Sequence, residues 1–188
     1  RAYNGPHEIR LNRNYENLGI AAHTNKLVDM STGEIIVFAD GDDISLPNRT
    51  KKSYEILTNN SDCKYLNFGY WKFYDNLENK QNIEQKYSSL DRIFLENLDL
   101  VRKFPISGAT TIVKSIYEIF GPLKRDTPVQ DSPIQLRYLL AGPIYKCKEP
   151  QIYYRIHENN LAAAYNKFKL DYERINEQYL LDLSRARN

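Results

Sequence analysis

The feature that most constrains the fold is an apolar run that ends abruptly in acids. Residues 35–39 read Ile-Ile-Val-Phe-Ala, and Asp40, Gly41, Asp42 and Asp43 follow at once. An unbroken, β-branched run of this length predicts a strand that is buried on both faces of a sheet. In open α/β sheets, ligands bind beyond the carboxyl ends of such strands. The sequence therefore predicts that Asp40 and Asp42 lie at a binding site.

The acidic motif has two interpretations, which the motif alone leaves open. Carboxylates at positions i and i+2 can hold one Mg²⁺ or Mn²⁺ and leave coordination positions for water and phosphate oxygens. Gly41 between them removes a side chain and lets a ligand approach the backbone. The same residues also favour a simple acidic turn. A calcium-binding EF-hand is disfavoured, because Ile44 and Lys51 stand where that loop requires oxygen ligands.

Length and charge set broad limits on the class of protein. The chain has 188 residues, which fits a single domain with a real core. Its formal net charge is +2 with basic residues scattered along the chain, so nothing indicates a nucleic-acid partner. No apolar run reaches the length of a membrane span, and no signal peptide opens the chain. These features, with a composition rich in Tyr, Asn, Lys and Ile, favour a cytoplasmic bacterial protein.

The two cysteines predict free thiols. Cys63 and Cys147 are far apart in the sequence and form no Cys-x-x-Cys motif. A reducing compartment with two free thiols is therefore the expectation, and a disulfide is the less favoured alternative.

Apolar periodicity and turn residues predict an alternation of helices and strands. The first helix, over residues 20–30, presents Ile20, Ala21, Thr24, Leu27 and Val28 on one face, and Gly33 ends it. The helix that begins at Arg49 points Tyr54 and Leu57 inward. Helices are predicted over residues 20–30, 49–58, 89–104, 114–120, 131–141 and 161–187, and strands over 35–39, 63–74, 109–113, 144–147 and 151–154, with an exposed loop over 76–85.

Four short blocks in this order resemble the family 2 glycosyltransferases of GT-A fold, from Asn14 to Leu161. The blocks are Asn17-Leu18-Gly19 with Asn25, the acidic motif with Pro47 and Arg49, Gly108-Ala109-Thr110 followed by Gln130-Asp131, and the segment from Tyr154 to Leu161. The resemblance implies an α/β fold with a mixed sheet flanked by helices. It implies one domain over residues 1–188, with a polar lead-in (1–13), a catalytic region (14–160) and a long C-terminal helix (161–188).

The resemblance implies roles at the acidic motif. Asp40 and Asp42 match the D-x-D pair that holds Mn²⁺ or Mg²⁺ against the diphosphate of a nucleotide sugar. Asp42 is the expected direct ligand, and Asp40 is the expected contact to the ribose. His157 matches a late histidine that completes the metal or diphosphate site in some members, while a loop histidine bonded to backbone is an equal alternative. Arg155 could meet the diphosphate or make a structural cation–π contact.

The resemblance also implies a general base. Asp131 matches the acid of the family's Glu-Asp motif, although Gln130 replaces the first acid. An acceptor hydroxyl must lose its proton as it attacks the anomeric carbon, and a positioned carboxylate can take that proton. A helix cap is the alternative role, and the two roles are compatible.

Three further residues receive weaker assignments. Asn25 matches a donor-side position, although His23 and Thr24 replace the usual Ala-Arg, so the donor contact is expected to differ. Gly108 falls where the acceptor or donor sugar meets a tight backbone turn. Trp71 could stack on a sugar, but a core position is the favoured alternative.

The front of the chain departs from the family pattern. Members normally open with a strand, a Pro-x-Tyr-Asn-like turn and a second strand ending in acids, which together bind the nucleotide base. Residues 1–13 contain none of these, so the expectation is an N-terminally incomplete sheet and weak or no donor binding by this chain alone. An incomplete sheet exposes an edge, which favours self-association.

The function expected from the resemblance is transfer of a sugar from a nucleotide-diphosphate donor to a saccharide or lipid-linked saccharide acceptor. Metal dependence, inversion at the anomeric carbon and a role in bacterial surface polysaccharide synthesis are expected, in the cytoplasm or in peripheral contact with the inner face of the membrane. The alternative is a non-catalytic GT-A-like binding module or an inactive fragment. A nucleotidyltransferase is a third interpretation, which the block from Tyr154 to His157 disfavours.

Overall fold

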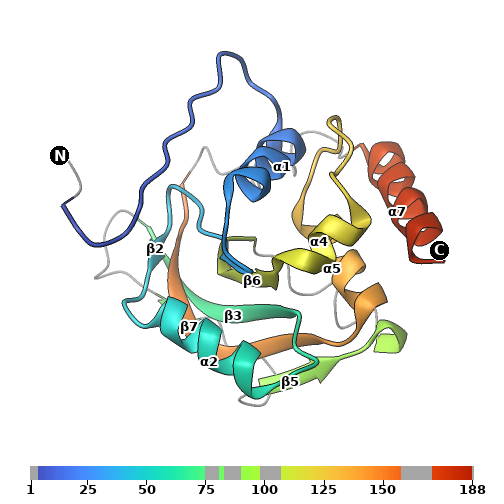
Figure 1. Cartoon of the computed structure of the whole chain (residues 1–188). Coiled ribbons are helices and arrows are strands. Elements are labelled where there is room, and N and C mark those ends of the chain that lie inside the picture. Colours follow the sequence, from blue (N-terminus) through green and yellow to red (C-terminus); the bar gives the residue numbers. More distant parts are fainter. Residues whose placement is uncertain (1–3, 75–80, 83–89, 98–106, 158–170, 188) are drawn as a thin grey trace.

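The computed structural model describes residues 4–74, 81–82, 90–97, 107–157 and 171–187. These residues form a mixed sheet with helices on both faces, which confirms the predicted α/β class (Figure 1). No described helix is long and apolar enough to cross a bilayer.

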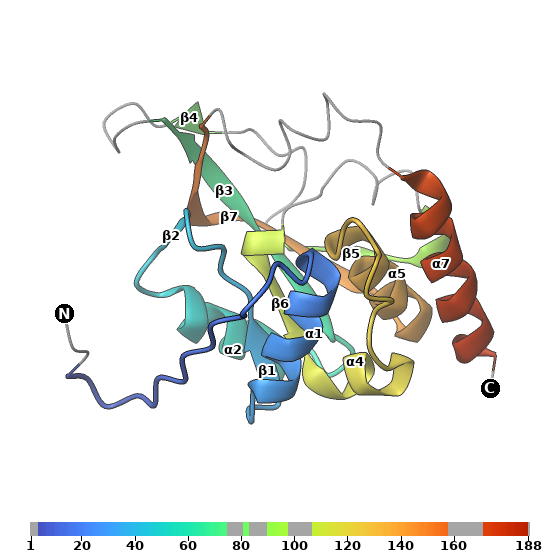
Figure 2. The same ribbon diagram turned by 90° about the horizontal axis from the view of Figure 1, so that it is seen from above.

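Two long parallel strands form the centre of the sheet. They are β3 (Tyr65–Phe73) and β7 (Ile144–Arg155), and they extend together away from the helices (Figure 2). The sheet has the order β1-β6-β3-β7-β2, while β4 pairs with β3 and β5 pairs with β7. The shorter strands are β1 (Ile35–Val37), β2 (Ile44–Ser45), β4 (Gln81–Asn82), β5 (Leu90–Ile93) and β6 (Thr110–Val113).

Helices cover the two faces unequally. Helices α1 (Ile20–Met30), α4 (Lys114–Phe120) and α5 (Asp131–Ala141) lie on one face, and α2 (Arg49–Asn59) lies on the other (Figure 1). Helix α7 (Tyr172–Ala186) packs against α4 and α5. Two short 3-10 turns, η2 (Leu95–Asn97) and η3 (Ser107–Ala109), complete the described elements.

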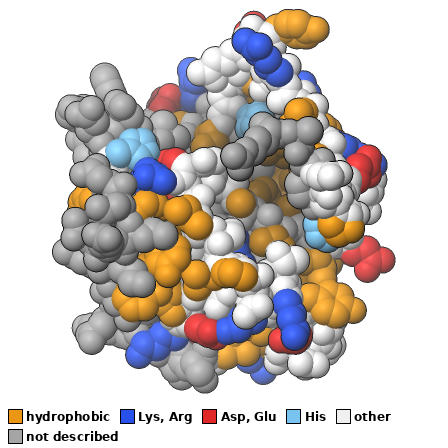
Figure 3. Space-filling model, turned by 90° about the vertical axis from the view of Figure 1, so that its left-hand side faces the viewer, with side chains coloured by type: hydrophobic (Ala, Val, Ile, Leu, Met, Phe, Trp, Pro, Cys, Tyr) orange, Lys and Arg blue, Asp and Glu red, His pale blue; other side chains and the backbone are white. Residues whose placement is uncertain are grey.

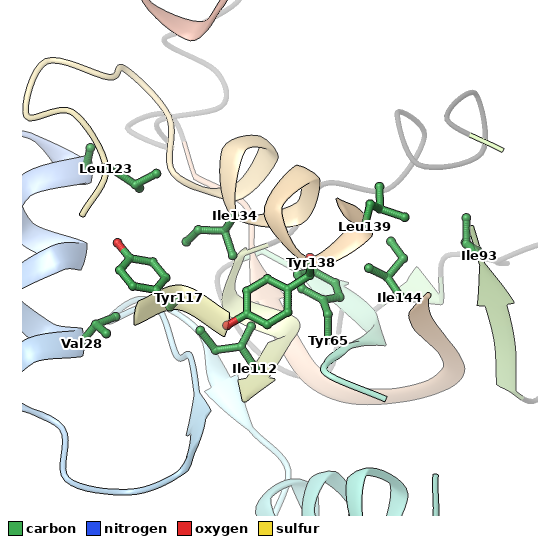
Figure 4. Close-up of a cluster of buried hydrophobic side chains, with 11 residues drawn as sticks. Val28, Tyr65, Ile93, Ile112, Tyr117, Leu123, Ile134, Tyr138, Leu139 and Ile144 are labelled. Atoms are coloured by element: carbon green, nitrogen blue, oxygen red, sulfur yellow. The ribbon is translucent and has the colours of Figure 1, made fainter. Parts of the chain in front are cut away.

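Strand alternation divides the core into two clusters, one on each face of the sheet. Tyr65 and Ile144 face α5, whereas the next residues, Leu66 and Tyr145, face α2. Such alternation follows from the period of two along a strand. In the cluster beneath α5, the rings of Tyr65 and Tyr138 lie 5.7 Å apart between centroids (Figure 4).

Local periodicity predicted most of the helices correctly. The bounds of α1 and α4 agree with the prediction, and α5 ends before Gly142 as expected. The inward faces were partly wrong, because Leu27 and Tyr54 are 44% and 60% exposed. Helix α1 also ends earlier than Gly33, with Ser31 as its C-cap in an extended conformation.

Several predicted strands and one helix need correction. Strand β1 is half-buried rather than buried on both faces, because it pairs with β6 and with no other described strand. The predicted helix over 89–104 is wrong over residues 90–97, where β5 pairs with β7 and η2 follows. The two strands predicted over 144–154 form one strand, β7, whose pairing with β3 shifts register around Gly69.

Some predictions reach outside the described residues. The predicted loop over 76–85 is described only at Gln81–Asn82, which form β4 rather than loop. Of the helix predicted over 161–187, the described part is α7, and residues 158–170 lie outside the described ranges. Cys63 and Cys147 are both free and buried, as expected.

Candidate active site

The acidic motif forms a tight turn directly after β1. The amide of Asp43 donates to the carbonyl of Asp40 over 3.3 Å, which closes the turn. Asp42 is exposed, while Asp40 and Asp43 are half-buried. The space around Gly41 is open, because a Cβ built there meets no atom within 4 Å. The turn therefore presents Asp42 to solvent and directs its two neighbouring acids inward.

Asp43 links this turn to the end of β7. Its Oδ1 accepts a hydrogen bond from the backbone amide of Arg155 over 2.9 Å. Burial and, to a smaller extent, the charges of Asp40 and Asp42 raise the pKa of Asp43 to about 6, against the opposing effects of the Arg155 amide and Arg49. Since Asp43 accepts a backbone hydrogen bond, its carboxylate fixes the distance between the acidic turn and β7.

Arg49 supplies positive charge from beneath the turn. Its side chain is buried at 2% exposure, and it donates to the hydroxyl of Ser45 over 2.9 Å and to the carbonyl of Phe38. Burial lowers the pKa of Arg49 to about 10, while the charges of Asp40 and Asp43 raise it. A guanidinium held by backbone acceptors stays charged, so it offsets part of the repulsion among the acids.

Gly108 packs against the inward acids. A Cβ built on Gly108 would lie 2.8 Å from one carboxylate oxygen of Asp40 and 2.8 Å from one of Asp43. Any side chain here would push the two carboxylates apart. Gly108 thus allows the close approach of η3 to the acidic turn, while its predicted contact with a sugar stays a prediction.

Two residues at the end of β7 hold Asp42. Nε2 of His157 lies 3.0 Å from Oδ2 of Asp42, and Nε of Arg155 donates to the carbonyl of Asp42 over 2.9 Å. The guanidinium of Arg155 also lies 4.5 Å above the ring of Phe73, so the predicted cation–π contact is present. On the face shown in Figure 3, histidine, basic and acidic side chains adjoin one another beside apolar surface.

The pair of Asp42 and His157 fits a divalent cation. Nε2 of His157 and Oδ2 of Asp42 are hydrogen-bonded over 3.0 Å, and a divalent cation ligated by both atoms would take the place of that hydrogen bond. The described residues contain no group of three or more His, Cys, Asp or Glu side chains arranged around one ion. Such an ion would therefore depend on water and phosphate oxygens for its remaining ligands, as Mg²⁺ commonly does at substrate phosphates.

Asp131 lies in a small pocket at the start of α5. The pocket is lined by Phe38, Tyr65, Thr110, Gln130, Asp131 and Ile134. Oδ1 of Asp131 accepts a hydrogen bond from the amide of Ser132 over 2.8 Å, but Asp131 is the first residue of α5 and Gln130 is the N-cap, so the alternative role of Asp131 as a helix cap is wrong. Burial raises the pKa of Asp131 and the charge of Asp40 adds to that rise, while its backbone hydrogen bonds and the charge of Lys146 lower it. The pKa direction suits a proton acceptor.

Two other predicted residues, Asn25 and Trp71, make structural contacts, and their proposed sugar or donor contacts stay predictions. The side-chain amide of Asn25 donates to the carbonyl of Leu123 and accepts from the Leu123 amide, both over 2.9 Å. The Tyr117 hydroxyl also donates to it over 2.6 Å, so Asn25 ties α1 to the segment after α4. Trp71 is half-buried in β3, between Asn82 of β4 and Tyr153 of β7.

Sequence reasoning missed three residues that the structure brings to the site. Asp43 is the third acid of the motif, and Arg49 follows it closely, so both signals were adjacent to the residues already chosen. Lys146 gave no signal, because it stands between apolar residues of a predicted strand. Only its burial and its effect on Asp131 reveal it.

Comparison with solved structures identifies the class of fold. The chain superimposes on S. aureus TarS in complex with UDP-GlcNAc with a TM-score of 0.67 at 13% identity, covering 89% of this chain and 46% of that one. A structure of S. aureus TarS with UDP gives 0.63 at 12% identity, covering 90% and 45%. The chain therefore has the GT-A glycosyltransferase fold.

The family follows from the sequence. The model of glycosyl transferase family 2 matches residues 1–120, and the chain belongs to this family. An uncharacterised glycosyltransferase of Methanocaldococcus jannaschii is 41% identical over 54 residues, which is 29% of this chain and 19% of that protein. The chain thus spans less than half the length of these relatives.

Proposed function

We propose that the protein transfers a sugar from a nucleotide-diphosphate donor to a hydroxyl of a saccharide acceptor, with a divalent cation and inversion at the anomeric carbon. The observation that carries this proposal is the meeting of Asp42 with Arg155 and His157 at one end of the site, close to a pocket that holds Asp131. The charge of Asp40 raises the pKa of both Asp43 and Asp131, so Asp40 acts on both parts of the site.

The leaving diphosphate would be held at Asp42 and His157. A Mn²⁺ or Mg²⁺ ion bound there, with Asp40 nearby, would neutralise the charge that develops on the diphosphate as the sugar leaves. Arg155 would hold Asp42 in place through its carbonyl and present the rest of its guanidinium to the phosphates. Asp43 and Arg49 would fix the turn without touching the donor.

The acceptor would react at the pocket. The acceptor oxygen forms a bond to the anomeric carbon while the bond from that carbon to the diphosphate oxygen breaks. Asp131 takes the proton that the acceptor hydroxyl loses. Attack from the face opposite the leaving group inverts the anomeric centre. Tyr65 and Thr110 line the same pocket as Asp131.

Donor and acceptor classes are proposed more broadly. Because the similar S. aureus TarS structures contain UDP-GlcNAc and UDP, a UDP-sugar is the donor to test first. A bacterial surface polysaccharide, free or lipid-linked, is the proposed acceptor class. Transfer would then occur in the cytoplasm, and a lipid-linked acceptor would bring the protein into peripheral contact with the membrane. Self-association through the edge of β1 is also proposed, and a measurement of the oligomeric state tests it.

The test is calorimetric titration of UDP into the 188-residue chain, with and without Mn²⁺. In this chain or, where its binding is too weak to measure, in one extended at its amino end, we expect binding that requires Mn²⁺, is lost in Asp42→Ala and is weakened at least tenfold in His157→Ala. Asp29→Ala is the matched control, because it removes one exposed carboxylate from α1 and should leave binding unchanged.

Two outcomes would count against the proposal. Equal binding without Mn²⁺ would refute metal dependence. Absence of binding of UDP, GDP and dTDP, both by this chain and by one extended at its amino end, would refute donor binding and favour the non-catalytic module. Turnover with a labelled UDP-sugar then separates an enzyme from a binding module.

A further inference from the structure

A row of polar side chains crosses the sheet beneath the start of α5. Thr110 of β6 is paired with Asn67 of β3, Asn67 with Lys146 of β7, and Lys146 with Asp91 of β5. Paired positions on adjacent strands point to the same face. We call Thr110, Asn67, Lys146 and Asp91 the polar row. Each residue of the polar row lies two positions along its strand from a residue of the apolar cluster that α5 covers.

Hydrogen bonds connect the row with the pocket. Nζ of Lys146 donates to Oδ1 of Asn67 over 3.3 Å, and Nδ2 of Asn67 donates to Oγ1 of Thr110 over 3.0 Å. The hydroxyls of Thr110 and Tyr65 lie 3.3 Å apart, and Nζ of Lys146 lies 5.7 Å from the centroid of the Tyr65 ring. Both Thr110 and Tyr65 line the pocket that contains Asp131.

The burial of Lys146 requires a physical reason. Its side chain is 1% exposed, and Asn67 and Thr110 are 5% and 4% exposed. A buried ammonium is costly unless it is paired and hydrogen-bonded, and an apolar residue would fill this strand position at lower cost. Burial lowers the pKa of Lys146 to about 7, and the charge of Asp131 opposes that fall. The charge of Lys146 in turn lowers the pKa of Asp131.

We propose that Lys146 is a positioning residue whose buried ammonium, fixed by Asn67, holds Asp131 in its carboxylate form. This inference rests on the proposed role of Asp131 as the base. A buried acid that takes a proton at neutral pH must first be ionised, and burial together with Asp40 works against ionisation. Lys146 supplies the opposing charge from β7.

Other titratable groups near Lys146 and Asp131 also contribute to the charge balance of this pair. Asp91 neighbours Lys146 on β5, and Asp40 acts on Asp131 from the acidic turn. Tyr65 lies between them on β3; burial raises the pKa of its phenol, so the phenol stays neutral. The remaining neighbours in the row, Asn67 and Thr110, carry no charge.

Side-chain NMR tests the coupling without any substrate. The Nζ and Cε signals of Lys146 and the carboxyl carbon of Asp131 are followed against pH in the 188-residue chain. We expect Asp131→Asn to lower the pKa of Lys146 by at least one unit, which is a tenfold change in proton affinity. Lys146→Met should raise the pKa of Asp131 by the same amount, because the coupling between two sites is reciprocal.

Asp131→Asn keeps the test decisive if Lys146→Met fails to fold, since asparagine has nearly the same shape as aspartate and its side-chain oxygen can still accept the hydrogen bond from the Ser132 amide. Asp29→Asn is the matched control and should leave the Lys146 titration unchanged. A shift of Lys146 below 0.3 units in Asp131→Asn would overturn the proposal. Because neither titration needs donor or turnover, this result is separate from the failure of the proposed function.

A kinetic readout follows once turnover is measured. In Asn67→Leu, which removes the acceptor that fixes the ammonium, the acidic limb of the kcat–pH profile should move to higher pH, while kcat on the alkaline plateau changes less than threefold. A uniform fall in kcat at all pH values, with the limb unmoved, would indicate a structural role only and overturn the proposal.

Discussion

The ion pair between α5 and α7 offers the sharpest test of how the C-terminal helix is held. Nε and Nη2 of Arg137 lie 3.0 Å from the two carboxylate oxygens of Asp182, and both side chains are fully buried. Nη1 of Arg137 donates to the carbonyl of Gly121 over 2.7 Å, and Gln178 donates to Asp182 over 2.9 Å. This pair is fully hydrogen-bonded, which is the condition under which a buried ion pair is tolerated.

Breaking the pair from either side should be costly. Arg137→Met leaves a buried carboxylate with the amide of Gln178. Asp182→Leu leaves a buried guanidinium with backbone carbonyls and the rings of Tyr117 and Phe120, but without its carboxylate partner. Each change should lower the free energy of unfolding by about 3–5 kcal/mol. A domain of this size has ~5–15 kcal/mol in total, so either variant should fall close to its unfolding threshold.

The double variant should be more stable than either single variant. With both charges gone, the main remaining cost is the unsatisfied amide of Gln178, which is about 1–3 kcal/mol. The sum of the two single losses is ~6–10 kcal/mol, so the coupling energy should be at least ~3 kcal/mol. Such a value identifies the pair as one unit that joins α7 to the helix that presents Asp131.

Urea unfolding followed by circular dichroism at low temperature measures these values. The pair of Arg125 and Glu16 is the matched control, because its atoms also lie 3.0 Å apart but its side chains are 68% and 71% exposed. Its coupling energy should stay below ~1 kcal/mol. If losses at Arg137 and Asp182 are additive, or if the two cycles give equal coupling, burial is not the source of the effect and the reasoning is wrong.

Three further predictions concern glycines and cysteines. Gly108→Ala should lower the free energy of unfolding by about 1–3 kcal/mol, because the new Cβ would crowd two carboxylates. Gly41→Ala is the control and should change the thermal midpoint little, and equal effects of the two variants would contradict the crowding. Gly69→Ala should cost about 3 kcal/mol or more, since its Cβ would lie 2.4 Å from a backbone carbonyl of β7 that has no room to move, and a wild-type thermal midpoint would disprove this contact. Burial raises the pKa of Cys63 to about 12 and also raises that of Cys147, so a thiol reagent at pH 8 should label both only after urea is added.

Elements with strong local signals were predictable from the sequence. Helix α5 follows from Asp131 at its start, Pro133 in its first turn and Gly142 after its end, and no distant contact is needed to explain it. The segment at 90–93 was misassigned because its apolar spacing also suits a helix. Pairing with the edge of β7 decides its conformation, and such tertiary contacts override local propensity.

The site was predictable where its residues are adjacent in sequence or belong to a known pattern. Asp42 and His157 were assigned together from the resemblance, and the structure brings them within hydrogen-bonding distance. Asp43 and Lys146 could not be assigned, because their roles depend on burial and on partners in distant strands. A lysine among strand residues gives no sign, in one sequence, of whether it faces solvent or the core.

The continuity of β7 has a consequence for how the site tolerates change. The strand carries Lys146 near its start and Arg155 at its end, with His157 two positions beyond. Because side chains alternate between faces, one residue inserted or deleted between these positions would keep Lys146 in place and turn Arg155 to the opposite face. The number of β7 residues between Lys146 and Arg155 already includes the register shift opposite Gly69 of β3. The length of β7 therefore sets the positions of these residues relative to one another. Substitutions along the strand should be common among related sequences, whereas insertions or deletions within it should disrupt the site.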